Sequence, residues 1–125
     1  MTKLNDCSDK EVLNFLQLYF ATVDLLTEAQ EKYRRLAEVS STTSLRSKYR
    51  ALALESERDL ELLKNQRRAF LANQLSIKPP SEATVEKTKL MADELAKILV
   101  KEANAAAIIE LAIKGLDAFN QVTTA

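Results

Sequence analysis

Glu102 is the ionisable residue with the most unusual position in the sequence. It lies within an apolar stripe of helical spacing that runs through residues 98–109. A carboxylate buried there needs a polar or cationic partner, or its pKa rises. Folding the chain back on itself about Lys78 places Glu102 opposite residues 50–58, which include Ser56 and two arginines. We interpret Glu102 as one member of a buried polar pair that fixes helix register, and Ser56, Arg50 or Arg58 as its possible partner. The alternative is an acid that contacts a ligand or a protein partner.

Basic residues are concentrated in the middle of the chain. Residues 41–80 carry eight basic and four acidic groups, whereas the whole chain has 18 of each and no net charge. Basic groups near tyrosines can bind phosphates, but the same pattern is typical of a solvated helix face with ion pairs three residues apart. We favour the solvated face, because a neutral chain is a poor non-specific binder of nucleic acids. The candidate patch comprises Arg46, Lys48, Arg50, Lys64, Arg67 and Arg68.

Most catalytic and ligand-binding chemistry is excluded by residue types that the chain lacks. It contains no histidine and a single glycine. Catalytic triads, imidazole metal ligands, phosphate-binding loops and dinucleotide fingerprints are therefore absent. The single cysteine, Cys7, precedes a predicted helix at a position where it packs against Val12. We expect no enzyme activity, no cofactor, no metal site and no small-molecule substrate.

The sequence also argues against a secreted or membrane-spanning protein. The first residues have no apolar segment of the kind that signal peptides need. No window reaches the 18 or so apolar residues that span a bilayer. One cysteine forms no internal disulfide, as is common in a reducing compartment. We expect a cytoplasmic protein without membrane contact.

Composition predicts an all-α fold in a single domain covering residues 1–125. Helix-forming residues dominate, and only one glycine and two prolines occur. Apolar periodicity places helices at about 9–39, 44–74 and 82–122. Three long helices with short connections favour an elongated up-down-up antiparallel three-helix bundle with coiled-coil-like packing.

Local signals set the predicted boundaries of these helices. Ser8 and Glu11 form a capping box, and Ser81 is a suitable N-cap after the Pro79–Pro80 pair. Five hydroxyl residues at 40–44 favour a turn. A continuous helix through them is the alternative, and it would favour a swapped dimer.

Two apolar stripes exceed what a one-sided helix face needs. They have the same spacing of 7, 4 and 7 residues, and both point away from the predicted core. Such a surplus usually marks an interface. The alternative is that the last helix bends over the first and buries them within one chain. The stripes are Leu18, Leu25, Ala29 and Leu36 in the first helix, and Val100, Ala107, Leu111 and Ala118 in the last.

These features favour a non-enzymatic helical interaction protein of the regulator, chaperone or accessory type. It would bind a protein partner or a second copy of itself, as a homodimer, through its apolar helix faces. The alternative is a protein that associates with nucleic acids through the basic groups of helix 44–74. We also expect Gly115, inside the last helix, to permit the close approach of another helix.

Overall fold

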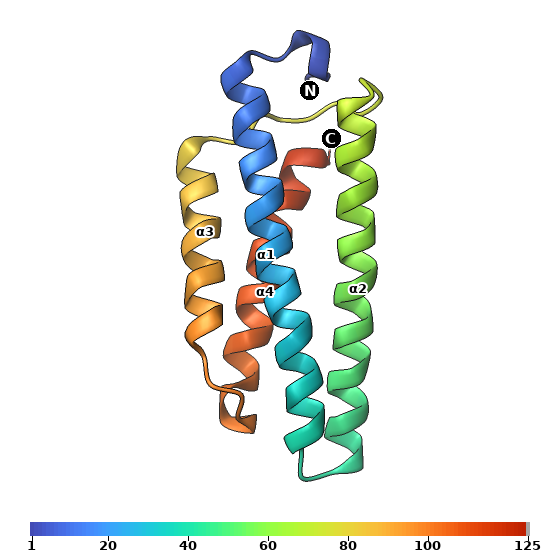
Figure 1. Cartoon of the computed structure of the whole chain (residues 1–125), viewed down its shortest axis with the longest axis vertical. Coiled ribbons are helices and arrows are strands. Elements are labelled where there is room, and N and C mark those ends of the chain that lie inside the picture. Colours follow the sequence, from blue (N-terminus) through green and yellow to red (C-terminus); the bar gives the residue numbers. More distant parts are fainter. Residues whose placement is uncertain (125) are drawn as a thin grey trace.

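Four α-helices form a bundle in the computed structural model, which describes residues 1–124. Helix α1 packs on each of the other three, and α3 also packs on α4. Helices α1 and α3 run in one direction and α2 and α4 in the other (Figure 1). The predicted all-α bundle is confirmed, but the three-helix arrangement is wrong. The helices are α1 (Asp9–Val39), α2 (Thr43–Leu71), α3 (Glu82–Lys97) and α4 (Ala105–Thr123), with short 3-10 helices η1 (Leu4–Asp6) and η2 (Glu102–Asn104).

The predicted helix 82–122 is two helices, because the chain leaves helical geometry at 98–101. Ile98 and Lys101 are both extended, with ψ angles of 126° and 148°. The chain then reverses, so that α4 returns beside α3 (Figure 1). No glycine or proline lies in this segment. The interactions that hold the reversal come instead from distant and local side chains. The side-chain amide of Asn104 donates to the backbone carbonyl of Leu99 at 2.9 Å. The ammonium of Lys32 in α1 donates to the backbone carbonyl of Ile98 at 2.8 Å.

Most predicted helix boundaries are confirmed. Ser8 and Glu11 form the reciprocal capping box of α1, and the hydroxyl of Ser81 accepts a hydrogen bond from an amide in the first turn of α3. A turn at 40–42 separates α1 from α2, and Thr42 caps α2. Helix α2 ends three residues before its predicted limit. Asn73 there adopts a left-handed conformation with φ of 58°, which stops the helix.

The chain termini and the α2–α3 connection meet at one end of the bundle (Figure 1). Thr2 and Ile77 exchange two backbone hydrogen bonds of 2.7 and 2.8 Å as an isolated antiparallel bridge. The amide of Lys78 donates to the carbonyl of Val122 at 2.8 Å. Cys7 packs against the core nearby, as predicted. Burial, and then the charges of nearby carboxylates, raise the pKa of its thiol.

The core surrounds α1, which therefore needs an apolar arc much wider than a surface helix does. Phe15 of α1 lies 4.4 Å from Phe70 of α2 and 5.8 Å from Phe119 of α4, measured between ring centroids. The first surplus stripe belongs to this core: Leu18, Leu25, Ala29 and Leu36 are all 0% exposed. The interpretation of these four residues as an interface is wrong for this fold, because α3 and α4 cover the side of α1 that a three-helix bundle leaves open.

Gly115 lies where α4 packs closely against Leu25 of α1. A Cβ atom at this position would lie 2.8 Å from both terminal methyl carbons of Leu25, which is fully buried. Such distances are shorter than van der Waals contact, so α4 could not pack this closely on α1 with a larger residue. The expected close approach of another helix at Gly115 is therefore confirmed.

Candidate functional site

The strongest candidate site is a groove between α2 and α4, which run in the same direction and both pack on α1 (Figure 1). Its inner part is a recess of about 130 Å³. Helix α1 supplies the floor, and α2 and α4 supply the walls. The lining residues are Leu26 and Tyr33 of α1, Leu52, Glu55, Ser56 and Asp59 of α2, and Ile109, Ala112, Ile113 and Leu116 of α4.

A wider and shallower hollow of about 610 Å³ continues this recess along α4. Ile109 and Ile113 line both spaces, so together they form one continuous surface, the α2/α4 groove. Along α4 it runs from Ala105 to Leu116, which corresponds to about 17 Å, or three helical turns. The hollow is lined by Lys48 of α2, Glu102 of η2, and Ala105, Ala106, Ile109, Glu110, Ile113 and Lys114 of α4.

The wall from α4 is apolar and partly made of small residues. Ile113 is 54% exposed although it is a large aliphatic residue in the middle of the groove. Ala105 and Ala106 precede it and leave room for another backbone to approach. Lys114 and Glu110 form an ion pair of 2.9 Å on this wall. The α4 side of the groove therefore offers apolar contact area with its nearest charges already paired.

Within the recess, the wall from α2 is acidic, whereas Lys48 of α2 lies in the wider hollow. Glu55 and Asp59 lie one helical turn apart and both face the groove. Burial, and then the charge of Glu55, raise the pKa of Asp59 above its ordinary value. Burial, and then the charges of Glu55 and Asp59, raise the pKa of Tyr33 on the floor to about 12. The groove thus combines an apolar surface with a local excess of negative charge.

We expect the stability of the protein to fall in strongly alkaline solution, in part because of Tyr33. Its pKa is raised from 10.0 to about 12 on folding, so the folded chain holds a proton that the unfolded chain loses between these values. The contribution is complete below pH 10 and disappears as pH rises towards 12. Denaturant unfolding of Tyr33→Phe between pH 9 and 12 should show a shallower decline than the unchanged protein. An identical decline in both would contradict the raised pKa.

Glu102 does not occupy the predicted buried position. Because the helix breaks before it, Glu102 lies exposed in η2, where its carboxylate accepts hydrogen bonds of 2.7 Å from the amide and 3.1 Å from the hydroxyl of Ser41. It thereby links the α1–α2 turn to the start of α4. Ser56 is only 5% exposed and lines the α2/α4 groove. Ser56 is therefore buried as predicted, but the buried position of Glu102 is wrong, and its carboxylate bonds to Ser41 and not to Ser56 or an arginine.

The second surplus stripe is not a single exposed surface. Val100 lies in the connection between α3 and α4, so it is not in register with the other three residues. Val100 and Leu111 are half-buried and pack against the core. Ala118 is half-buried, and Ala107 alone is exposed. The apolar surface that α4 leaves free is instead centred on Ile113.

The predicted basic patch is divided between different surroundings. The guanidinium of Arg67 lies 5.1 Å from the ring centroid of Tyr19 and is half-buried, while Lys48 lies in the groove and Arg50 lines a hollow between α1 and α2. Arg46, Lys64 and Arg68 are exposed on α2.

Acidic residues interrupt the exposed basic face of α2. Glu57 follows Arg50 by seven residues, and Glu61 precedes Arg68 by seven. Seven residues are close to two helical turns, so Glu57 lies on the same face of α2 as Arg50, and Glu61 on the same face as Arg68. Both carboxylates lie between the basic residues near the two ends of the helix. The six basic residues therefore do not form one continuous surface.

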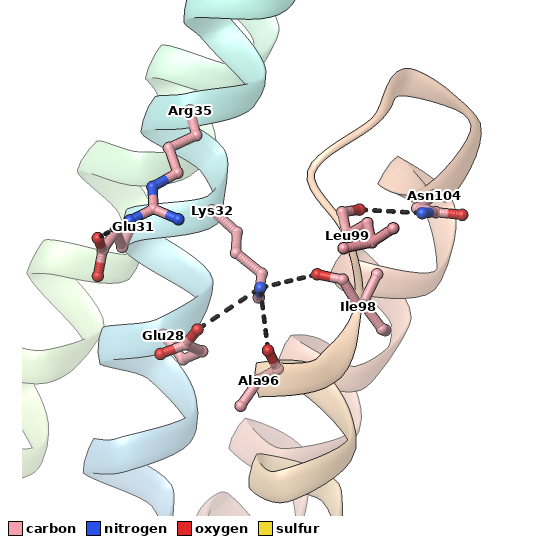
Figure 2. Close-up of polar contacts among 8 residues, drawn as sticks. All are labelled: Glu28, Glu31, Lys32, Arg35, Ala96, Ile98, Leu99 and Asn104. Atoms are coloured by element: carbon pink, nitrogen blue, oxygen red, sulfur yellow. Dashed lines mark hydrogen bonds and ion pairs between the residues drawn. The ribbon is translucent and has the colours of Figure 1, made fainter.

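Lys32 is a buried polar residue that the sequence reasoning missed. It is 5% exposed, and its ammonium donates to the carbonyls of Ile98 at 2.8 Å and Ala96 at 3.5 Å (Figure 2). It also lies 3.5 Å from the carboxylate of Glu28. These carbonyls belong to the end of α3, where helices leave acceptors without partners. The spacing of the sequence could have predicted its burial, because Lys32 lies three residues after Ala29 and four before Leu36, within the apolar stripe of α1.

Comparison with known proteins does not add a family to this description: no protein-family model, no curated protein and no solved structure matches the chain. Within residues 1–124, no helix combines the length and apolar character needed to cross a membrane. The same residues contain no group of three or more histidine, cysteine or acidic side chains arranged to hold a metal ion.

Proposed function

We propose that this protein is a non-enzymatic helical interaction protein that binds an α-helix of another protein in the α2/α4 groove. The observation that carries the proposal is the exposure of Ile113 in the middle of an apolar groove three helical turns long. Amphipathic helices bind such grooves by inserting apolar side chains spaced three or four residues apart. The proposed setting is the cytoplasm, which is consistent with a single cysteine.

The shape of the groove supports a helix as the occupant over a small molecule. Its inner recess of about 130 Å³ is below the roughly 300–1,000 Å³ of typical small-molecule sites. The remainder is shallow and elongated, and it follows the axis of α4. A helix laid along this surface would contact Ile109, Ile113 and the small residues Ala105 and Ala106 together.

The rest of the fold supports a different protein over a second copy of this chain. Each of the four described helices already buries an apolar face within the bundle. Large apolar residues also remain exposed on α1, α2 and α3, but none of them lines the groove. Examples are Phe20, Leu54, Leu62 and Leu90. A second copy therefore has no free amphipathic helix to insert. The interrupted basic face of α2 also favours a protein partner over a nucleic acid.

Photo-crosslinking from Ile113 tests this proposal in the cells that express the chain. We expect benzoylphenylalanine at position 113 to give a discrete crosslinked product. Mass spectrometry should place the crosslink in a partner segment with apolar residues at i, i+3 or i+4, and i+7. Benzoylphenylalanine at Leu90, which is 65% exposed on α3, is the matched control and should not capture the same segment. A product made of two copies of this chain, a nucleic-acid adduct, or equal capture from both positions would contradict the proposal.

A further inference from the structure

We propose that the helix bound in the α2/α4 groove carries a lysine or arginine whose charged group pairs with Glu55 and Asp59. This inference rests on the proposed function and specifies the chemistry of the partner. The partner would thus be a basic amphipathic helix, with its apolar side chains on the α4 wall and its cation on the α2 wall.

The charges of the groove favour a cation at this point. On α4, Glu110 is paired with Lys114 at 2.9 Å. At the end of the groove, the carboxylate of Glu102 accepts hydrogen bonds from Ser41. Among residues 1–124, Glu55 and Asp59 form no ion pair, although both line the recess. Lys48 also lines the groove, but it lies in the wider hollow and not in the recess. The recess itself therefore presents two negative charges, from Glu55 and Asp59, with which a partner can pair.

Partial burial of Asp59 makes a partner's charge effective at this point, and Glu55 beside it is exposed. Asp59 is half-buried, and burial raises its pKa, so its ionised form is poorly solvated. Glu55 adds a second negative charge one turn away. A cation that enters the recess would relieve both the partial desolvation of Asp59 and its repulsion by Glu55, in surroundings that screen charges less than open solvent does. An ion pair with the partner should contribute more to the binding free energy here than it would on an open helix surface.

The geometry of the recess suits a long basic side chain. Leu52 and Leu116 line it together with the two carboxylates. Lysine and arginine have aliphatic stems that pack on such apolar side chains while the charged group reaches a polar one. Ser56 and the hydroxyl-bearing Tyr33 also line the recess and add polar character near the proposed ion pair. A neutral apolar side chain at the same point would bury the carboxylates without a partner.

A helical-peptide display library with randomised surface positions tests the inference directly. Selection on the unchanged protein, with counter-selection against Ile113→Lys, should enrich peptides with one basic position flanked by apolar residues. Fluorescence polarisation then measures the enriched peptides on the double variant Glu55→Gln, Asp59→Asn. We expect roughly tenfold weaker binding to this variant, as for the loss of a charged pair. The matched control Glu57→Gln, Glu61→Gln changes the charge of α2 equally on its other face and should weaken binding less than twofold.

The outcomes separate the two proposals. Peptides that depend on Ile113 but show no basic position, or that bind both double variants equally, would overturn the inference and leave the groove as a helix-binding site. Failure to enrich any peptide that distinguishes the unchanged protein from Ile113→Lys would overturn the proposed function as well. Circular-dichroism melting of each variant establishes that it is folded. Both double variants replace half-buried or exposed residues and should retain the fold.

Discussion

Replacing Leu25 with lysine is expected to unfold most of the protein at neutral pH. Leu25 is 0% exposed and lies against Gly115, where α1 and α4 approach closely. A lysine there would place an ammonium group in an apolar core with no partner and would also exceed the available space. We expect a loss of about 4 kcal/mol or more in the free energy of unfolding. Far-ultraviolet circular dichroism and urea denaturation would measure it.

The companion variant Ile113→Lys separates a core role from an interface role. Ile113 is 54% exposed on the same helix as Gly115, so its replacement should change the free energy of unfolding by no more than about 0.5 kcal/mol. If Leu25→Lys instead remained fully helical and only changed the molecular mass in light scattering, the stripe of α1 would be an interface after all. That result would contradict the packing of α1 in the centre of the bundle.

Replacing Lys32 with methionine is expected to destabilise the connection between α3 and α4. Methionine preserves most of the apolar stem but removes the ammonium that donates to the carbonyls of Ile98 and Ala96 (Figure 2). The partly buried carbonyls at the end of α3 would then lack this donor, at a cost of roughly 1–2 kcal/mol in the free energy of unfolding. Urea denaturation would measure the loss. Relative to the unchanged protein, Lys32→Met should increase the rate of backbone amide exchange more at 98–104 than in the α1–α2 turn.

Arg35→Met is the matched control for Lys32→Met. Arg35 lies three residues further along α1 and forms an ion pair of 2.7 Å with Glu31 on the surface (Figure 2). Exposed pairs of this kind contribute little, so the change should be within about 0.5 kcal/mol. Equal effects of the two variants would show that the contacts of Lys32 with α3 do not stabilise the fold.

Features encoded by a few adjacent residues could be predicted from the sequence. The capping box of Ser8 and Glu11, the N-cap at Ser81 and the turn after Ser40 are local, because each side chain bonds to its own helix end. The all-α class follows from composition in the same way. The close approach at Gly115 was also predictable, since an interior glycine costs helix stability and needs a compensating contact.

The reversal at 98–101 depends on contacts that are distant in sequence, and this is why it was missed. Lys32 is 66 residues from Ile98, and Ser41 is 61 residues from Glu102. Periodicity alone continues through the break, since Ile98 and Ile109 both face the core side. Because this turn was not recognised, the prediction had three helices in place of four. It therefore also placed the apolar stripe of α1 on the surface, whereas α3 and α4 bury it.

The groove itself was only partly predictable. A surplus apolar stripe was predicted on the last helix, but of its four residues only Ala107 is exposed. The exposed Ile113 was not among them, because α3 and α4 were treated as one helix. Ser56 was singled out and does line the groove. The position of Glu55 and Asp59 beside an apolar recess was not predictable from α2 alone, because the other wall is α4, which follows in sequence about 50 residues later.

Hydrogen–deuterium exchange of the protein with and without an enriched display peptide tests the central claim most directly. If the α2/α4 groove binds a helix, protection on binding should be confined to 52–59 of α2 and 105–116 of α4, and Ile113→Lys should abolish it. Protection that centred on the outer face of α3 around Leu90, or that persisted unchanged in Ile113→Lys, would contradict the claim.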